Sequence, residues 1–382
     1  MVLAVRRFAP GTGLDDFIAA GTAVYNDDSR WVAPLEFELR DRLTPKKNPF
    51  FEHAEAALFV AYRDGQPVGR ISAQIDREHL RVHGERVGFF GFFDTINDAA
   101  VSSLLLDQAR DWLSERGMER MRGPLSLSIN EEVGLLVEGF EHQQTLMNNY
   151  ARPYQGALAE AYGLEKAKDV FGWHYHVQKI PARAEKAWEA IMAMPEVTLR
   201  TVDRRHMSRD VHIILDVFND AWSDNWGFVP ATPAEAKKMA SDMRLVIEQE
   251  LSYIAEIDGK PMGVLVCLPN MVEAIEGLDG KLWPSGWLKL LWRLKVKRPK
   301  SARLMLLGLR KEVRQHKRFA GLAMAMYVEL TKRGSAIGYE WGELGWTLED
   351  NTLVNLAAKG MGAKVAKRYR IYEMPLTETT ST

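Results

Sequence analysis

The chain has 382 residues, of which 46% are hydrophobic and 26% are charged, and its formal net charge is −1. This length suffices for two domains, and the composition is typical of a soluble globular protein. The single cysteine, Cys267, excludes disulfides and cysteine-rich metal sites, so we expect no metal. No stretch approaches the roughly 20 apolar residues that a spanning helix needs, and the N-terminus lacks a secretory signal. We therefore expect a cytoplasmic protein.

The first half of the chain contains a predicted hairpin and a long helix, and the second half repeats this plan. Phe59–Ile71 reads as strand, Asp-Gly turn and strand, and a helix follows from Asp98 to Gly117. In the second half the hairpin falls at Tyr253–Leu265 and the helix at Gly321–Gly334. We therefore predict two like domains and a flexible tail, with the ranges 1–180, 197–376 and 377–382.

A segment of mixed polarity follows the first long helix. Residues 122–132 combine Gly-Pro, alternating serines and an asparagine, whereas residues 133–140 are unusually apolar, and amides and aromatics follow at 148–154. The mixture favours a lining for a substrate that is polar at one end and apolar along its length. The alternative is a buried connection whose polar groups are satisfied internally. The candidate substrate-binding residues are Ser128, Asn130, Asn149 and Tyr150.

A basic, tryptophan-rich segment precedes the second long helix. From Lys289 to Arg318 twelve residues are Lys or Arg, and only Glu312 is acidic. Four apolar residues share one helical face, namely Trp283, Trp287, Leu291 and Leu294. Three basic residues share another face, namely Lys289, Arg293 and Lys297. The pattern favours a helix lying on an anionic membrane surface, at the inner face of the cell membrane. A helix packed on its own domain is the alternative. The candidate membrane contacts are Trp283, Trp287, Lys289, Trp292 and Arg293.

The run Arg318–Ala323 has the features of an anion-binding helix start. An apolar strand, Leu304–Leu309, leads through a polar connection into this run and then into the helix that closes at Gly334. The first N–H groups of a helix have no intrahelical partner, and the helix dipole adds positive charge there. We therefore predict that Arg318, Phe319, Ala320, Gly321, Leu322 and Ala323 bind a phosphorylated cofactor. The alternative is a helix start whose glycine only packs closely.

The order of these segments resembles the GNAT superfamily of acyl-CoA N-acyltransferases. Arg318-x-x-Gly321-x-Ala323 matches that superfamily's pyrophosphate-binding signature. A strand at Glu340–Leu348, a helix opened by Asn351 and a last strand at Val365–Glu373 follow in the expected order. The resemblance covers 197–375 well and the first half in outline, since the first half lacks a matching cradle. It implies an α/β (α+β) fold of two tandem GNAT-like domains, each with a mixed, mostly antiparallel sheet flanked by helices, and only the second binding acyl-CoA.

The resemblance also implies where the chemistry occurs. In GNAT enzymes two central strands splay apart, and the acyl thioester lies in the gap. Glu340 and Glu343 lie on opposite faces of their strand, so we expect one of them to face this gap and act as the base. Tyr369 or Tyr372 on the last strand is expected to protonate the leaving thiolate. The candidate catalytic residues are Glu343, Asn351 and Tyr369, although a solvated glutamate, an N-cap and a packing tyrosine are the ordinary roles of these residues.

Among two-domain GNAT proteins the chain resembles the bacterial ceramide synthase type. This resemblance implies transfer of a fatty acyl group from acyl-CoA, a co-substrate rather than a tightly bound cofactor, to the amine of a long-chain sphingoid base. The expected partners are therefore acyl-CoA, an amphiphilic amine and an anionic membrane surface, without nucleic acid. Two alternatives stay open. One is a transferase that acts on a peptide, amino sugar or aminoacyl acceptor, and the other is a non-catalytic acyl-CoA or lipid sensor.

Overall fold

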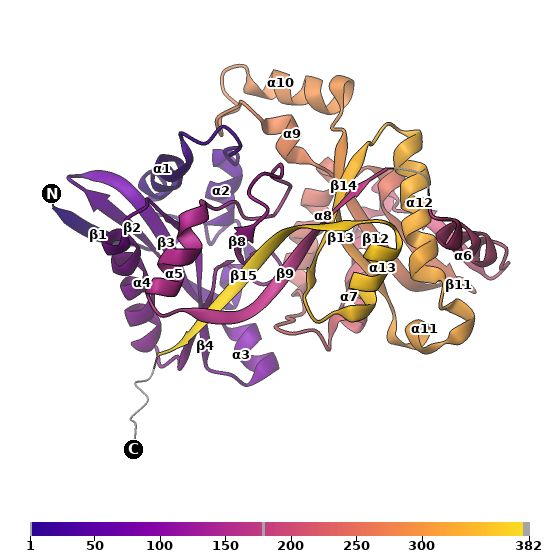
Figure 1. The fold of residues 1–382 in the computed structure, drawn as a ribbon, viewed down its shortest axis with the longest axis horizontal. Coiled ribbons are helices and arrows are strands. Elements are labelled where there is room, and N and C mark those ends of the chain that lie inside the picture. Colours follow the sequence, from indigo (N-terminus) through magenta and orange to yellow (C-terminus); the bar gives the residue numbers. More distant parts are fainter. Residues whose placement is uncertain (1, 178–179, 377–382) are drawn as a thin grey trace. The chain divides into compact units, whose positions relative to one another are not determined.

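The computed structural model describes residues 2–177 and 180–376, which divide into two compact units (Figure 1). Unit 1 takes its described residues from 2–170, 275–288 and 367–376, and unit 2 from 171–177, 180–274 and 289–366. The predicted tail, 377–382, lies outside the described residues, and the predicted domain ranges stay predictions. Four elements cross from one unit's residues to the other's: β9 (Glu165–His176), α9 (Met271–Ile275), α10 (Gly286–Trp292) and β15 (Lys364–Pro375).

Unit 1 is built on a mixed sheet in the order β1-β2-β3-β4-β5-β15. Neighbouring strands are antiparallel except β4 and β5, which are parallel, and β8 also pairs with β15. Its strands are β1 (Leu3–Phe8), β2 (Ala54–Arg63), β3 (Gln66–Asp76), β4 (Val87–Thr95), β5 (Arg120–Gly123), β6 (Leu125–Ser126), β7 (Glu132–Val133) and β8 (Leu135–Glu138). Its helices are α1 (Leu14–Tyr25), α2 (Glu36–Arg42), α3 (Arg77–His83), α4 (Ala99–Ser114) and α5 (Pro153–Ala161).

Helices α1 and α4 cover opposite faces of the unit 1 sheet. A Cβ added to Gly21 of α1 would lie 2.5 Å from the Arg70 guanidinium carbon, whereas one added to Gly69 would meet Leu105 of α4 at 2.9 Å. Consecutive strand residues point to opposite faces of a sheet. Because α1 lies against Arg70 and α4 lies against its neighbour Gly69, the two helices lie on opposite faces.

Unit 2 repeats the plan in the strand order β10-β11-β12-β13-β14, with the end of β9 beside β14. Strands β13 and β14 are parallel, and the pairs among β10 to β13 are antiparallel. Its strands are β10 (Val197–Thr201), β11 (Tyr253–Ile257), β12 (Lys260–Pro269), β13 (Ser301–Leu309) and β14 (Trp341–Leu348). Its helices are α6 (Ala182–Met192), α7 (Met207–Trp222), α8 (Pro233–Val246), α11 (Lys311–Gln315), α12 (Leu322–Ala336) and α13 (Thr352–Gly360).

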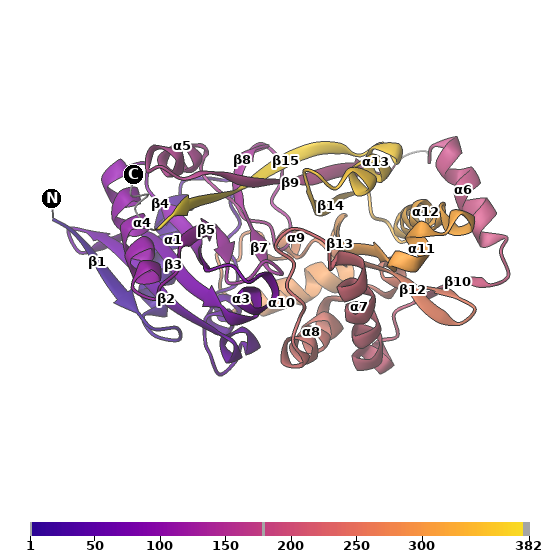
Figure 2. The same cartoon turned by 90° about the horizontal axis from the view of Figure 1, so that it is seen from below.

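The two faces of the unit 2 sheet also carry different helices. On one face α12 and α6 share a buried apolar cluster with the strands, to which Trp173, Tyr175 and Leu304 contribute. On the other face α7 approaches so closely that a Cβ on Gly308 would lie 2.0 Å from the Trp222 ring. Figure 2 shows α6 and α12 on one side of β12 and β13, and α7 and α8 on the other.

The predicted secondary structure is largely confirmed. Both hairpins form, and their turn residues adopt the left-handed conformation that a two-residue turn between twisted strands requires, with φ of 49° and 82° at Asp64 and Gly65 and of 50° and 73° at Asp258 and Gly259. Both long helices form at the predicted places. None of the helices within 2–177 and 180–376 is both long and apolar enough to cross a bilayer.

Candidate active site

The strands β13 and β14 of unit 2 are joined only at their beginnings. They pair from Ser301 with Trp341 to Leu304 with Leu344, although β13 continues to Leu309 and β14 to Leu348. Gly345, with φ of 91°, follows the last pair. Beyond this pair, over the described length of both strands, no pairing joins the facing N–H and C=O groups of β13 and β14. A buried backbone group without a partner costs free energy, so this gap suits a ligand that carries amides.

Helix α12 follows β13 and α11 along the chain, so it comes soon after one of the two strands that border this gap. In the described part of the chain no side chain caps its N-terminus, where Gly321 is the N-cap residue. Arg318 lies in the short 3₁₀ turn just before it, is 59% exposed at its side chain and forms an ion pair with Glu196. Uncapped N–H groups beside a guanidinium are a suitable site for a phosphate.

Gly321 packs against α6 without a close approach. Its φ is −85°, and a Cβ added to it would lie 3.4 Å from the Ile191 side chain and 3.6 Å from that of Ala187, both on α6. These are ordinary contact distances, so the packing of α6 on α12 does not itself require a glycine. This observation disfavours the alternative that Gly321 serves only for close packing.

Unit 1 fills both of the corresponding features with its own residues. Helix α4 is capped by Asp98, whose carboxylate accepts from the N–H groups of Ala100 at 2.8 Å and Val101 at 3.3 Å. Arg63 donates to the same carboxylate at 2.5 Å and is the main cause of its lowered pKa. A negative charge thus already occupies the position at which α12 of unit 2 has no side-chain cap among the described residues. The sequence signalled this difference by the lack of a matching cradle in the first half, and the cap by Asp98 is a finding of the structure.

The gap between β4 and β5 of unit 1 is filled by the chain that follows β5. These strands pair only from Val87 to Phe89, and the backbone of Leu125 lies so close to β4 that a Cβ on Gly91 would be 2.1 Å from its carbonyl oxygen. Gln74 donates to the same oxygen at 2.6 Å. These contacts are consistent with a first half that lacks a nucleotide site, which stays a prediction.

A small apolar cavity of about 40 Å³ lies inside unit 2, beside the paired ends of β13 and β14. Its lining includes Cys267, Leu304, Tyr327, Thr331 and Glu343. Burial raises the pKa of the Cys267 thiol well above its usual range, so this cysteine stays protonated and is a poor nucleophile. We therefore do not expect Cys267 to act as a covalent nucleophile.

The three candidate catalytic residues lie in different surroundings. Glu343 is 3% exposed on β14, one residue before the strands separate. Asn351 caps α13, where its side-chain oxygen accepts from the N–H of Val354 at 3.5 Å. Tyr369 is buried on β15 among the residues of unit 1, and there it pairs with Leu136. Glu343 and Asn351 thus share unit 2, whereas the catalytic roles of all three stay predictions.

The candidate substrate-binding residues lie in two loops of unit 1, and the side chains of three of them form hydrogen bonds within that unit. The Ser128 hydroxyl accepts from the N–H of Asn130 at 3.2 Å, and Asn149 donates to the Gly134 carbonyl at 2.6 Å. Tyr150 donates to Asp28 at 2.6 Å, and burial together with this hydrogen bond raises the pKa of its phenol. These contacts favour the alternative reading of a buried connection, and a substrate-binding role stays a prediction.

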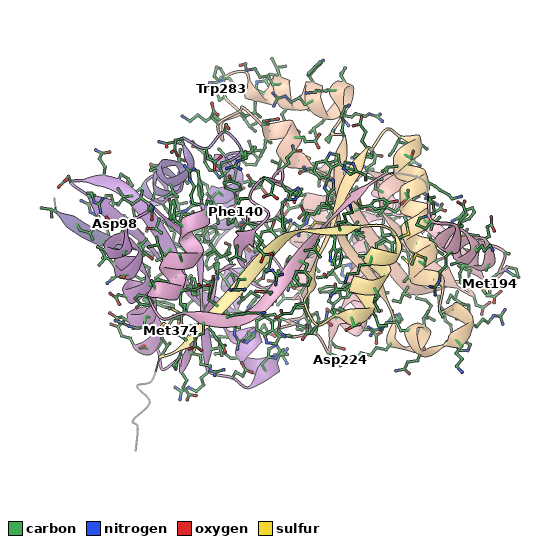
Figure 3. All side chains as sticks on the ribbon, in the orientation of Figure 1. Asp98, Phe140, Met194, Asp224, Trp283 and Met374 are labelled. Carbon is green, nitrogen blue, oxygen red and sulfur yellow. The ribbon has the colours of Figure 1, made fainter. Side chains whose placement is uncertain are left out.

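The predicted membrane helix is shorter than its sequence pattern. Helix α10 begins at Gly286, so Trp283 lies on the turn before it rather than on its face (Figure 3). The chain continues after Trp292 as one π-helical turn, and Arg293 donates to the carbonyl of Ala274 at 3.0 Å. The apolar side chains are nevertheless exposed, from Trp283 at 82% through Trp287, Leu288, Leu291 and Trp292 to Val296. This exposure disfavours a helix packed on its own domain by these side chains, and membrane contact stays a prediction.

Two histidines that the sequence analysis missed lie on β9, and the ring of one of them, His174, contacts the Trp341 ring of β14. His174 and His176 alternate with Trp173 and Tyr175 on β9, and their Nε2 atoms are 2.9 Å apart. Their spacing of two residues on a strand was the only sequence signal, and it carries no meaning until the neighbouring strand is known.

Comparison with known proteins identifies the class and then the family. Two solved structures share the fold over nearly the whole chain. A tandem GNAT protein from the clavulanic acid biosynthesis pathway, solved without AcCoA, matches with a TM-score of 0.58 at 11% identity, covering 99% of this chain and 100% of that one. A GCN5-related N-acetyltransferase from Sphaerobacter thermophilus matches with a TM-score of 0.55 at 16% identity, covering 98% and 96%. The fold is therefore that of a tandem GNAT protein, as predicted.

Sequence relatives give the family. The chain is 42% identical over 366 residues to the bacterial ceramide synthase of Caulobacter vibrioides, covering 95% of each protein. It is 37% identical over 371 residues to protein YghO of Escherichia coli, covering 97% of this chain and 94% of that one. No protein-family model matches the chain. The chain belongs to the family of the bacterial ceramide synthase, which confirms the predicted family and enzyme class.

Proposed function

We propose that this protein transfers a fatty acyl group from acyl-CoA to the amine of a long-chain sphingoid base, such as sphinganine or 3-oxosphinganine, and so forms a ceramide. Family membership supports the choice of reaction. The observation that carries the mechanism is in unit 2. There the strands β13 and β14 separate after their first pairs, and the uncapped start of α12 lies between these two strands in the sequence.

The donor would bind to the backbone of unit 2. The pyrophosphate would accept hydrogen bonds from the first N–H groups of α12, with Arg318 turning from Glu196 to the phosphates. The amides of the pantetheine arm would pair with the backbone of β13 beyond Leu304. The thioester carbonyl would then lie where the strands diverge, and backbone N–H groups there would stabilise its oxyanion.

The reaction is the addition of a free amine to this thioester. A long-chain ammonium must first lose a proton, and the amine then attacks the carbonyl carbon and forms a tetrahedral intermediate. Collapse of the intermediate breaks the C–S bond, and the CoA thiolate takes a proton. Glu343 is buried close to the point where β13 and β14 separate, and this position supports the proposal that its carboxylate assists the loss of the amine proton.

The exposed apolar side chains of α10 and the π turn after it would attach the protein to the membrane that holds the acceptor. Trp283, Trp287 and Trp292 are exposed, and Lys289 and Lys295 lie in the same stretch. Tryptophan combined with lysine suits the boundary between anionic head groups and acyl chains. We place the protein at such a surface.

The test is a direct assay of the purified full chain. It is incubated with palmitoyl-CoA and either sphinganine, 3-oxosphinganine, glucosamine or a short peptide, and free CoA and the N-acyl product are measured. Product formed with long-chain bases alone supports the proposal. Product formed with glucosamine or peptide instead would show a transferase with another acceptor. Tight acyl-CoA binding without product would show a sensor.

A further inference from the structure

The two faces of strand β9 in unit 2 have different partners. Tyr175 points toward α12, where its hydroxyl lies 3.1 Å from that of Thr331, and Trp173 belongs to the same apolar cluster. His174 and His176 alternate with these residues and therefore lie on the opposite face. Their contacts agree, since the His174 ring lies 4.9 Å from the Trp341 ring, at 32° between the planes.

The pairing of β9 with β14 brings His174 to the face of β14 that carries Glu343. Val177 donates to the carbonyl of Glu340 at 2.8 Å, and Phe171 lies beside Gly345, so the two strands run in opposite directions. Counted from the first contact His174 stands opposite Glu343, and counted from the second it stands opposite Gly342, so the register shifts by one residue between them. The His174 ring contacts Trp341, which shares a face with Glu343 because the two residues are two apart on the strand. Opposed or diagonal neighbours on one face have Cβ atoms within about 8 Å of each other.

The row continues into β13. Arg303 is paired in register with Glu343, is 2% exposed and donates to the carbonyl of Gly345 at 3.0 Å. Its neighbours Ala302 and Leu304 belong to the cluster under α12, so Arg303 lies on the same face as Glu343. An imidazole, a carboxylate and a guanidinium thus follow one another across three strands, immediately before β13 and β14 separate.

The two imidazoles lie within hydrogen-bond distance of each other. At an Nε2–Nε2 distance of 2.9 Å, one ring donates and the other accepts, because two lone pairs or two N–H groups would repel at this distance. His174 is half-buried beside Glu343, whereas His176 is exposed. When the Nε2–H of His174 donates to His176, a proton taken up at Nδ1 of His174 releases the Nε2 proton to His176 and on to water.

We propose that His174 is the general base of the acyl transfer, that Glu343 positions it and stabilises its cationic form, and that His176 passes the proton to solvent. This inference rests on the proposed function. An N–H bond of the acceptor ammonium breaks, and the proton goes to His174. The free amine then forms the C–N bond to the thioester carbon, the C–S bond breaks, and the sulfur takes a second amine proton. The products are the amide, CoA thiol and one proton released through His176.

The experiment compares variants of the full chain in the palmitoyl-CoA and sphinganine assay. His174→Ala is expected to lower kcat by about 10²- to 10⁴-fold, the usual contribution of a general base, with acyl-CoA affinity unchanged. Added imidazole is expected to restore part of the rate, which it would not do for a residue with only a structural role. His176→Ala is expected to lose less, because water can replace the relay, and His212→Ala, an exposed histidine on α7, is the matched control.

The outcomes separate this inference from the proposed function. An active wild type with unchanged kcat in His174→Ala overturns the base alone, whereas a wild type that acylates no amine overturns both. The thermal unfolding midpoint of His174→Gln is also measured, so that a loss of rate caused by misfolding can be recognised. A folded His174→Gln that keeps the wild-type rate contradicts the inference. A rate abolished by EDTA in the wild type also contradicts it, because a metal on the two Nε2 atoms would leave neither free to take a proton.

Discussion

The start of α12 offers a matched pair of substitutions that differ in charge alone. Gly321→Asp and Gly321→Asn add side chains of nearly the same shape, and both would direct them toward α6 at ordinary contact distance from Ile191. The aspartate places a carboxylate beside the helix N-terminus, as Asp98 does in α4 of unit 1. If the pyrophosphate binds at this terminus, the aspartate should repel it, and the asparagine should not.

The size of the effect follows from Coulomb's law. Two unit charges about 6 Å apart repel by about 3 kcal/mol at an effective dielectric constant of about 20. Salt screening at a partly exposed site reduces this by about half, to about 1.5 kcal/mol, which corresponds to roughly tenfold in affinity. We therefore expect Gly321→Asp to bind palmitoyl-CoA about tenfold more weakly than Gly321→Asn at low salt, with the difference shrinking as salt is added.

Titration calorimetry with palmitoyl-CoA measures both affinities, and thermal unfolding checks that the variants are folded. Equal affinities for the aspartate and asparagine variants would refute a phosphate site at this helix start. A loss of binding in both variants, without a difference between them, would indicate that the packing of α6 on Gly321 matters and the charge does not.

Three further outcomes are expected. Asp98→Ala should destabilise the protein by about 1–2 kcal/mol in urea unfolding, since a cap and the bond from Arg63 are lost, while palmitoyl-CoA affinity stays unchanged. The pKa of Asp98 is lowered in the folded state. Its contribution to stability is therefore present above its unfolded pKa of about 4 and is lost as the pH falls below that value. Equal acid sensitivity of the variant and the wild type would contradict this. Trp287→Ala combined with Trp292→Ala should weaken binding to anionic liposomes about tenfold, and unchanged sedimentation with liposomes would remove α10 as the contact. Cys267 should resist iodoacetamide at pH 8 until denaturant is added, because burial raises its pKa; rapid labelling of the native protein would contradict this.

The parts of the fold that depend on local chemistry could be predicted from the sequence. The turns at Asp64-Gly65 and Asp258-Gly259 follow from the backbone preferences of these residues alone. The start of α4 follows from Asp98, whose carboxylate caps the helix. The order of strand, turn and helix around Arg318 likewise depends on neighbours in the chain. These features needed no knowledge of distant segments.

The parts that depend on long-range packing could not be predicted. Helical spacing put Trp283 on the face of α10, but the helix begins only at Gly286. The side of Gly321 that faces α6 follows from tertiary packing alone. The proximity of His174 to Glu343 depends on the register of two strands that are far apart in the sequence, and a shift of one residue would turn every side chain to the other face.

The path of β15 has a consequence for how the protein is made. This strand begins in unit 2 and ends in unit 1, where Tyr372 to Pro375 pair with β5. A ribosome therefore delivers this partner of β5 only after all the other strands of both units. Until then β5 lacks this neighbour, and an unpaired strand edge invites contact with other chains. We expect nascent chains truncated before Lys364 to aggregate or recruit chaperones, and the two halves to fail as separately expressed proteins.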